Sequence, residues 1–245
     1  MKIFMALMGL DIGGAETHVL ELALELKRRG HEIVLASNGG VYVAELEKTG
    51  IRHIQVPMNH RSPLLMAKSL RRLRRAILLE KPDLVHAHAR IPAFLCGILQ
   101  KRMGFPLITT AHWVFAVTPL LRRITDWGAR TVAVSEDIKT YLMTEYQVPE
   151  DQIHVTINGI NTEDFSPARS HPELREELGL GDGSVIGLVS RLDESRALAA
   201  EKLIGAAPEI FAKYPDTRIL IVGGGGREAE LKRRAAEVNA ALGGN

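Results

Sequence analysis

The segment MKIFMALMGLDIGGAETHVLELALELKRRG, residues 1–30, contains the pattern that decides the fold. Residues 3–8 form an apolar run of strand length, and the turn that follows contains the adjacent glycines Gly13 and Gly14. Apolar residues then recur at helical spacing up to Gly30, a typical helix-stop residue. A short strand, a glycine turn and an amphipathic helix make the first half of a βαβ unit, which predicts a parallel sheet.

The same alternation continues along the chain. Strands are predicted at 3–8, 32–36, 53–56, 84–88, 107–111, 131–134 and 154–157, and later at 184–190 and 218–222. Helices are predicted at 14–29, 41–48, 63–80, 92–102, 119–127 and 136–146, and later at 172–178, 195–214 and 228–242. Between the two series lies a stretch rich in turn-forming residues. The fold class is therefore α/β, with one complete parallel-sheet domain at 1–165 and the incomplete start of a second at 166–245.

Composition narrows the class of protein. The 245 residues are 46% hydrophobic and 24% charged, which is typical of a globular protein. The single cysteine, Cys96, cannot form an intramolecular disulfide or a cysteine-rich zinc site, so we expect a cytoplasmic protein. The apolar stretch 91–99 has about half of the roughly 20 residues that a membrane span needs. We therefore expect no transmembrane helix, and we interpret the apolar start as a strand rather than a signal peptide.

The predicted helix at 63–80 is amphipathic and strongly basic. Apolar residues follow one face, and the rest of the helix carries Lys68, Arg71, Arg72, Arg74 and Arg75. The favoured interpretation is a helix packed on the sheet with a solvated charged face. The alternative is peripheral contact with an anionic membrane at its inner face. Nucleic acid is not an expected partner, because the chain has few aromatic residues and no recognisable binding motif.

The turn around Gly13 and Gly14 is a candidate anion site. Glycines let backbone N–H groups approach a phosphate, and the start of the next helix adds partial positive charge. The turn matches neither the dinucleotide fingerprint nor the phosphate-binding P-loop. Phosphate binding and a plain strand-to-helix turn therefore both remain open.

Three histidines stand at the ends of predicted strands. His86 and His88 are two residues apart, so both side chains point to one face of the sheet. They are hydrogen-bonded or they line a cleft; no third ligand stands at metal spacing beside them, so we expect no metal. His112 follows the next strand at its carboxyl end, where open α/β sheets bind ligands, and is a candidate site residue.

Two arginines follow the predicted strand at 184–190. Arg191 and Arg196 could converge on one diphosphate, because guanidinium groups bind phosphate oxygens in a fork. The alternative is surface ion pairing with Asp193 and Glu194. A second glycine turn, 223–226, follows the last predicted strand.

Eight short motifs occur in a characteristic order. They are GGAETH at 13–18, RGHE at 29–32, PDLVHAH at 82–88, TTAH at 109–112, AVSE at 133–136, NGIN at 158–161 with Phe165 and Pro167, SRL at 190–192 and LIVGGG at 220–225. Because it has these motifs in this order, the chain resembles the retaining glycosyltransferases of family 4. The resemblance implies a GT-B fold, in which a Rossmann-like acceptor domain faces a Rossmann-like donor domain.

The resemblance also implies an activity and a set of site residues. The activity would be transfer of a sugar from a nucleotide-diphosphate-sugar donor to an envelope glycan, lipid-linked or small-molecule acceptor, with retention and without a metal cofactor. His112 would be catalytic, while Gly13, Gly14, Arg191 and Arg196 would bind the donor diphosphate. The acceptor or cleft candidates are Glu16, His18, His86, His88 and Asn158.

The chain also departs from the family pattern. It has Arg196 and Ala197 where the family usually has Lys-Gly, and the resemblance implies that the family's donor-binding Glu-x7-Glu segment should lie beyond residue 245. We therefore expect the amino-terminal domain plus a truncated donor domain, with little or no transferase activity in this chain alone. The alternative is a noncatalytic acceptor-binding or partner module that needs another chain for donor binding.

Overall fold

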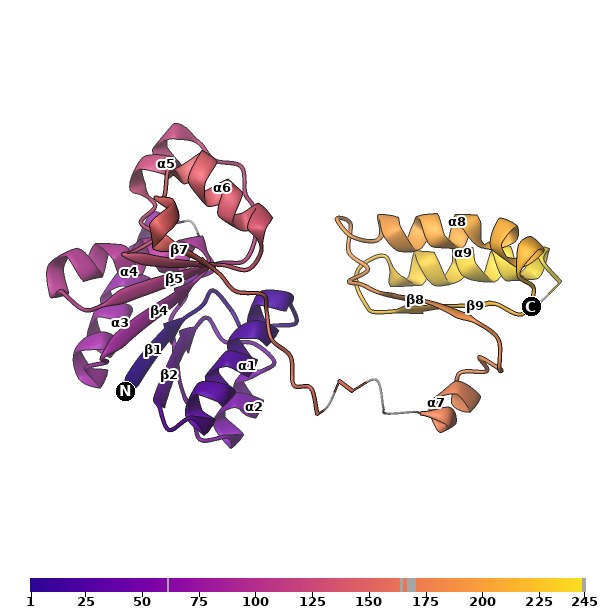
Figure 1. Cartoon of the computed structure of the whole chain (residues 1–245), viewed down its shortest axis with the longest axis horizontal. Helices are drawn as coiled ribbons and strands as arrows, with labels where there is room; N and C mark the ends of the chain where they lie inside the picture. The colour runs from indigo at the N-terminus through magenta and orange to yellow at the C-terminus, as the bar shows by residue number, and fades with distance from the viewer. Residues whose placement is uncertain (61, 164, 167–170, 244–245) are drawn as a thin grey trace. The chain divides into compact units, whose positions relative to one another are not determined.

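The computed structural model describes residues 1–60, 62–163, 165–166 and 171–243, so Pro167 lies outside the described residues. The chain divides into two compact units, unit 1 (Met1–Phe165) and unit 2 (Ser166–Asn245). The elements of unit 1, shown in Figure 1, are β1 (Lys2–Ala6), α1 (Gly14–Arg28), β2 (Glu32–Ser37), α2 (Val43–Lys48), β3 (Arg52–Gln55), α3 (Pro63–Glu80), β4 (Leu84–His88), α4 (Arg90–Met103), β5 (Leu107–Ala111), α5 (Pro119–Ile124), β6 (Arg130–Ala133), α6 (Glu136–Tyr146) and β7 (Ile153–Val155).

The described strands of unit 1 form one parallel sheet. Their order is β3-β2-β1-β4-β5-β6-β7, which confirms the parallel α/β domain that the alternating pattern predicts. The chain order reverses between β1 and β4, because β2 and β3 extend the sheet on one side and β5 to β7 on the other. In open α/β sheets, ligands bind at such a reversal, outside the carboxyl ends of the strands.

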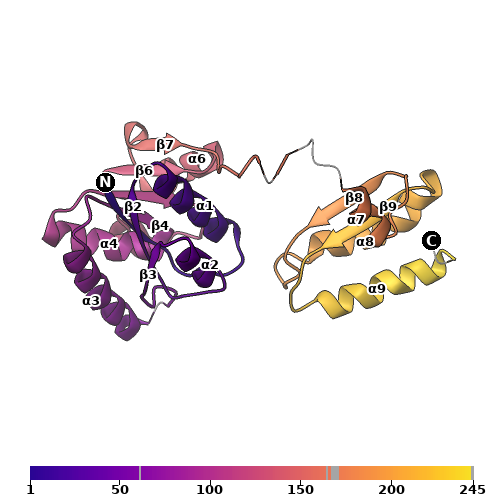
Figure 2. The same ribbon diagram turned by 90° about the horizontal axis from the view of Figure 1, so that it is seen from below.

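Helices cover both faces of this sheet, as Figures 1 and 2 show. One apolar cluster joins α1 and α2 to β1 and β2, and another joins α3 and α4 to the opposite face. In β4, Val85 and Ala87 belong to the cluster under α3 and α4. The alternating residues His86 and His88 therefore face the side of α1.

The basic helix α3 packs on the sheet through its apolar face. Leu73 and Ile77 are buried in the core, while the basic residues Lys68, Arg71, Arg72, Arg74 and Arg75 are exposed. This arrangement confirms the sheet-packed helix with a charged outer face. Membrane contact of that face stays a prediction. None of the helices in the described ranges combines the length and apolar character that a bilayer crossing requires.

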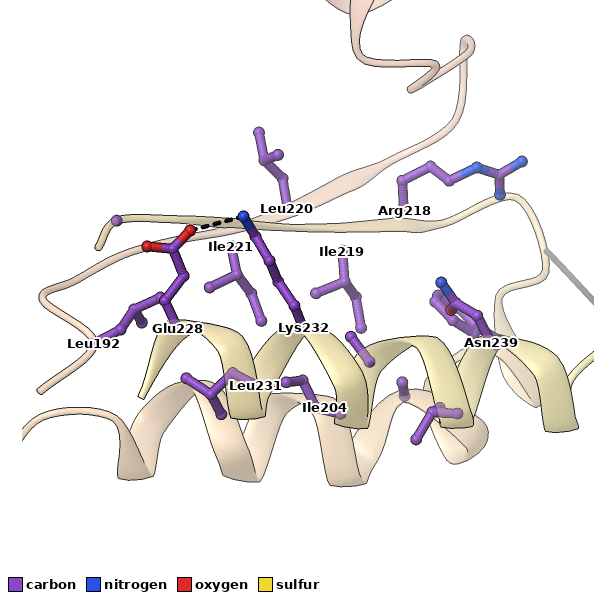
Figure 3. Close-up of a pocket in the computed structure, with 15 residues that line it drawn as sticks. Leu192, Ile204, Arg218, Ile219, Leu220, Ile221, Glu228, Leu231, Lys232 and Asn239 are labelled. Atoms are coloured by element: carbon purple, nitrogen blue, oxygen red, sulfur yellow. Dashed lines mark hydrogen bonds and ion pairs between the residues drawn. The ribbon is translucent and has the colours of Figure 1, made fainter. Parts of the chain in front are cut away.

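Unit 2 has a smaller sheet. Its elements are α7 (Pro172–Glu177), β8 (Val185–Val189), α8 (Leu198–Lys213), β9 (Arg218–Val222) and α9 (Glu228–Ala241). In the described part of unit 2, β8 and β9 pair in parallel, and α8 and α9 lie together on one face of them. Figure 3 shows Ile219 and Ile221 pointing toward the helices, while Leu220 points away. A cavity of about 390 Å³ remains within this apolar layer.

Candidate active site

The glycine turn after β1 packs tightly on the chain that follows β2. The Leu10 N–H donates to the Gly39 carbonyl at 2.8 Å, and a Cβ on Gly40 would overlap the Leu10 backbone. Gly40 also has φ +145°, so this position strongly favours glycine. The contact fixes the path of the turn that leads into α1.

Gly13 and Gly14 begin α1 without needing the conformational freedom of glycine. Gly13 has an extended φ of 179°, and a Cβ on Gly14 would find no atom within 4 Å. Open space therefore lies beside Gly14, at a helix start whose first N–H groups have no partner inside the helix. The Glu16 carboxylate folds back toward Gly13, where negative charge is favourable. The geometry leaves the phosphate-binding prediction for Gly14 untested.

Four histidines from three segments meet at the carboxyl ends of β4 and β5. We call His18, His86, His88 and His112 the histidine cluster. The His86 and His88 ring centroids are 4.0 Å apart, and Nε2 of His86 lies 2.8 Å from the Thr110 hydroxyl. His88 Nδ1 lies 3.2 Å from His112 Nε2. The His18 ring stands edge-on to that of His112, with 5.1 Å between centroids.

Burial keeps the histidine cluster uncharged. It lowers the pKa of His86 to about 3 and holds the pKa of His88 well below its usual range. Burial, with the neighbouring His18, lowers the pKa of His112 to about 4. The pKa of His18 is also lowered by burial. At neutral pH these rings therefore offer lone pairs and N–H donors rather than positive charge.

The fold brings together three histidine nitrogens whose proximity the spacing along the chain does not reveal. One ring nitrogen from each of His18, His88 and His112 lies within 4.8 Å of the others. The expectation of no third ligand beside His88 is therefore wrong, because it rested on separation along the sequence. His86 is hydrogen-bonded and buried, which is one of the two interpretations left open for it.

Arg90 is a site residue that the motifs did not indicate. It opens α4 directly after β4, and its guanidinium lies over the Phe115 ring, 5.1 Å from the centroid. Its Nη1 atom is buried without a hydrogen-bond partner among the described residues, as is Nε2 of His88. Ala89, between these two, has φ 71°. The available indication in the sequence was a cationic residue two positions after His88, the last residue of β4.

Asn158 lies on an exposed segment after β7. Its neighbours Ile157 and Gly159, together with His18, line a cavity of about 890 Å³ beside α1. Asn158 itself is not among the residues that line this cavity. The structure therefore brings the segment to the site but leaves the acceptor role of Asn158 as a prediction.

In unit 2, the turn after β8 carries both predicted diphosphate residues, Arg191 and Arg196. Asp193 pairs with Arg191 at 3.5 Å and with Arg196 at 3.7 Å, which is the ion-pair alternative. The glycine turn after β9 approaches the turn after β8 so closely that a Cβ on Gly223 would overlap Ser190. Both guanidinium groups remain about half exposed, at 50% and 42%, so they are accessible to a ligand. Their role in binding diphosphate stays a prediction.

Known proteins resemble this chain in both sequence and fold. The family model described as Glycosyltransferase Family 4 matches residues 12–164. A subunit of the human phosphatidylinositol N-acetylglucosaminyltransferase is 24% identical over 91% of this chain and 47% of its own length. The Mycolicibacterium smegmatis GDP-mannose-dependent alpha-(1-6)-phosphatidylinositol monomannoside mannosyltransferase is 27% identical over 94% of this chain and 62% of its own length. The chain thus spans about half to three fifths of these curated relatives.

A solved structure agrees with the family match. A glycosyltransferase from Rickettsia africae has a TM-score of 0.82 and 26% identity, and the match covers 99% of this chain and 65% of that one. The likeness confirms the GT-B-like α/β fold that the motifs predict. The family model covers more than half of the chain, from the turn after β1 to the end of unit 1. The chain therefore belongs to glycosyltransferase family 4.

Proposed function

We propose that this chain transfers a sugar from a nucleotide-diphosphate-sugar donor to an acceptor, with retention of anomeric configuration. The observation that carries the proposal is His112, an uncharged imidazole at the carboxyl edge of the sheet, beside the start of α1. The names of the relatives support it, since they include an N-acetylglucosaminyltransferase and a GDP-mannose-dependent mannosyltransferase.

Each proposed role follows from the chemistry of the leaving group. Cleavage of a glycosyl–phosphate bond builds negative charge on the departing diphosphate, and fixed donors and cations stabilise such charge. Gly14 would contribute backbone N–H groups at the start of α1, and Arg191 and Arg196 would contribute guanidinium groups. His112 would contact the transferred sugar as an uncharged hydrogen-bonding group.

The acceptor is proposed to be lipid-linked and reached at a membrane surface. The outer face of α3 combines exposed basic residues with Leu64 and Leu79, which are 83% and 68% exposed. Such a face fits the headgroup region of an anionic bilayer. The names of two relatives contain phosphatidylinositol, which agrees with an acceptor of this kind. The protein would then act as a peripheral protein at the inner face of the membrane.

The second candidate is an acceptor-binding module without catalysis. It is favoured by the Asp193 ion pairs, which engage the two arginines proposed for the donor. In addition, β8 and β9 form the only strand pair of unit 2 among the described residues. We therefore expect little or no turnover by the 245-residue chain alone.

One experiment separates the two candidates. The purified chain is titrated calorimetrically with UDP-glucose, UDP-N-acetylglucosamine and GDP-mannose, and then incubated with each radiolabelled donor and phosphatidylinositol vesicles. A transferase binds at least one donor and labels lipid, and His112→Ala loses the labelling while His154→Ala, on the exposed end of the sheet, retains it. Lipid binding with no donor binding would instead establish the acceptor-binding module.

A further inference from the structure

The Arg90 guanidinium lacks the acidic partners that another partly buried arginine of this chain has. Arg227 pairs with Glu230 at 2.7 Å and with Glu201 at 3.4 Å. The Arg90 side chain takes part in no hydrogen bond or ion pair among the described residues, and its Nη1 atom is buried. A buried donor without an acceptor lowers the stability of a fold, so its presence at a candidate site requires an explanation.

An aromatic ring takes the place of an acid beside Arg90. The guanidinium lies over the Phe115 ring, 5.1 Å from the centroid, and a cation in this position keeps its N–H groups for a ligand. Phe115 is itself held in place, because the Tyr141 hydroxyl accepts from its N–H at 3.1 Å and donates to its carbonyl at 3.0 Å. The fold therefore positions this cation without using up its hydrogen-bonding groups.

The position of Arg90 separates it from the glycine turn proposed for the donor. Arg90 begins α4 on one face of the sheet, whereas Gly14 begins α1 on the other face. Arg90 follows His88 by two residues. Phe115 follows His112 by three residues, on the loop after β5. The guanidinium therefore borders the candidate site from the side opposite Gly14, which fits a group on the second substrate, the acceptor.

The chemistry of these side chains indicates the class of ligand. Guanidinium N–H groups bind two oxygens of a phosphate in a fork, which gives both strength and geometric selectivity. Trp113 and Val114, exposed on the loop that carries Phe115, add apolar surface of the kind that suits the lipid part of a lipid phosphate. Because only a ring contact holds the guanidinium, it can turn toward an anion without breaking a hydrogen bond to any described residue.

We propose that Arg90 binds a phosphate ester on the acceptor and makes the chain select phosphorylated acceptors. The proposal rests on the proposed sugar transfer, because it specifies the acceptor of that reaction. The bound phosphate oxygens accept hydrogen bonds from the guanidinium N–H groups that the described part of the fold leaves unpaired. The phosphate belongs either to a soluble ester or to a lipid headgroup, and the experiment distinguishes these two sources.

NMR titration of the ¹⁵N-labelled chain detects this binding without a donor. The phosphate probes are sn-glycerol 3-phosphate, a soluble ester, and dihexanoyl phosphatidic acid, a lipid headgroup. Glycerol and glycerate are the matched probes without phosphate, and the second of them carries a carboxylate. We expect the phosphate probes to shift the Arg90 side-chain Nε resonance and to bind about tenfold or more tightly than glycerol or glycerate. The tighter of the two phosphate probes identifies the source of the phosphate.

Substitutions of Arg90 separate ligand binding from packing. Arg90→Gln should weaken binding of both phosphate probes by about tenfold or more, and Arg90→Lys, which keeps the charge but loses the fork, by less. Arg90→Met removes the unpaired donor and keeps an apolar stem, so its Tm should equal or exceed that of the unmodified chain. Arg102→Gln, exposed at the other end of α4, is the matched control and should bind normally.

Three outcomes would overturn the assignment of Arg90. They are equal phosphate binding by Arg90→Gln and Arg102→Gln, glycerate binding as tight as that of sn-glycerol 3-phosphate, and a lowered Tm of Arg90→Met with phosphate binding unchanged. If the chain binds a nucleotide-sugar donor while any of these is observed, the sugar transfer stands without this role of Arg90. Conversely, phosphate binding that depends on Arg90 in a chain that binds no donor would support the assignment and contradict the sugar transfer.

Discussion

Nδ1 of His88 lies 3.2 Å from Nε2 of His112, across the pairing of β4 with β5. His88 is fully buried, whereas His112 stands just beyond the end of its strand. One of these nitrogens must donate a proton and the other must accept it, because both rings are uncharged. The buried ring therefore orients the ring that we place at the centre of the site.

His88→Ala tests this orienting contact. The substitution removes the hydrogen bond and leaves a buried void, so we expect the free energy of unfolding to fall by about 2–4 kcal/mol. The ring ¹⁵N shifts of His112 should also change, a readout that loss of packing elsewhere would not move. His154→Ala should alter neither quantity. Unchanged His112 shifts in a folded His88→Ala protein would show that the contact does not orient the ring.

Gly14→Ala separates ligand binding from stability. A Cβ at this position meets nothing within 4 Å, so stability should be unchanged or raised by up to about 1 kcal/mol. A methyl group beside the open helix start should nevertheless weaken nucleotide-sugar binding, as measured by calorimetry. Gly205→Ala, exposed inside α8 with equally open space, is the matched control and should bind normally. Equal donor binding by both variants would remove Gly14 from the site.

Most of the fold could be predicted from the periodic pattern of apolar residues. Strands and helices were predictable because burial alternates with the period of each element, and the predicted range of α3 is the observed one. The first residue of a helix or strand was harder to predict. α8 begins at Leu198 rather than residue 195, because the Asp193 carboxylate accepts from the Ser195 and Arg196 N–H groups at 3.0 Å and holds a turn there.

The candidate site was predictable only in part. His86, His88 and His112 could be placed because strand ends are readable from sequence and parallel strands share an edge. The approach of the His18 ring to those of His88 and His112 depends on how α1 packs on the sheet, which no local pattern encodes. The start of α4 at Arg90 depends on the positive φ of Ala89, a non-glycine residue.

Glu80→Gln tests a partly buried ion pair that ties α3 to the sheet. The Glu80 carboxylate, 7% exposed, contacts Lys2 at 2.8 Å and Arg52 at 2.6 Å, and its hydrogen bond raises the pKa of Lys2. Loss of its charge should lower the free energy of unfolding by about 1–3 kcal/mol, measured by urea denaturation. Glu32 also pairs with Lys2, but its side chain is 66% exposed, so Glu32→Gln should lower the free energy of unfolding by less than about 1 kcal/mol. Equal losses would contradict this ranking.

Vesicle binding tests the basic face of α3. Each Lys or Arg near an anionic membrane contributes about 1 kcal/mol, so the double variant Arg71→Glu, Arg75→Glu should weaken co-sedimentation with phosphatidylserine vesicles by about tenfold or more. Lys48→Glu, on α2 at the opposite face of the sheet, should have little effect. The membrane contact would be ruled out if the unmodified chain, the double variant and Lys48→Glu bound vesicles equally weakly, or if binding did not respond to salt.

The measurement that tests the central claim most directly is an NMR titration of the ¹⁵N-labelled chain with UDP-glucose, UDP-N-acetylglucosamine and GDP-mannose. The account predicts that at least one donor shifts the Gly14 amide and the ring nitrogens of His112 together, with a single saturating affinity. The result would contradict the account if none of the three donors moved either residue while the protein remained folded.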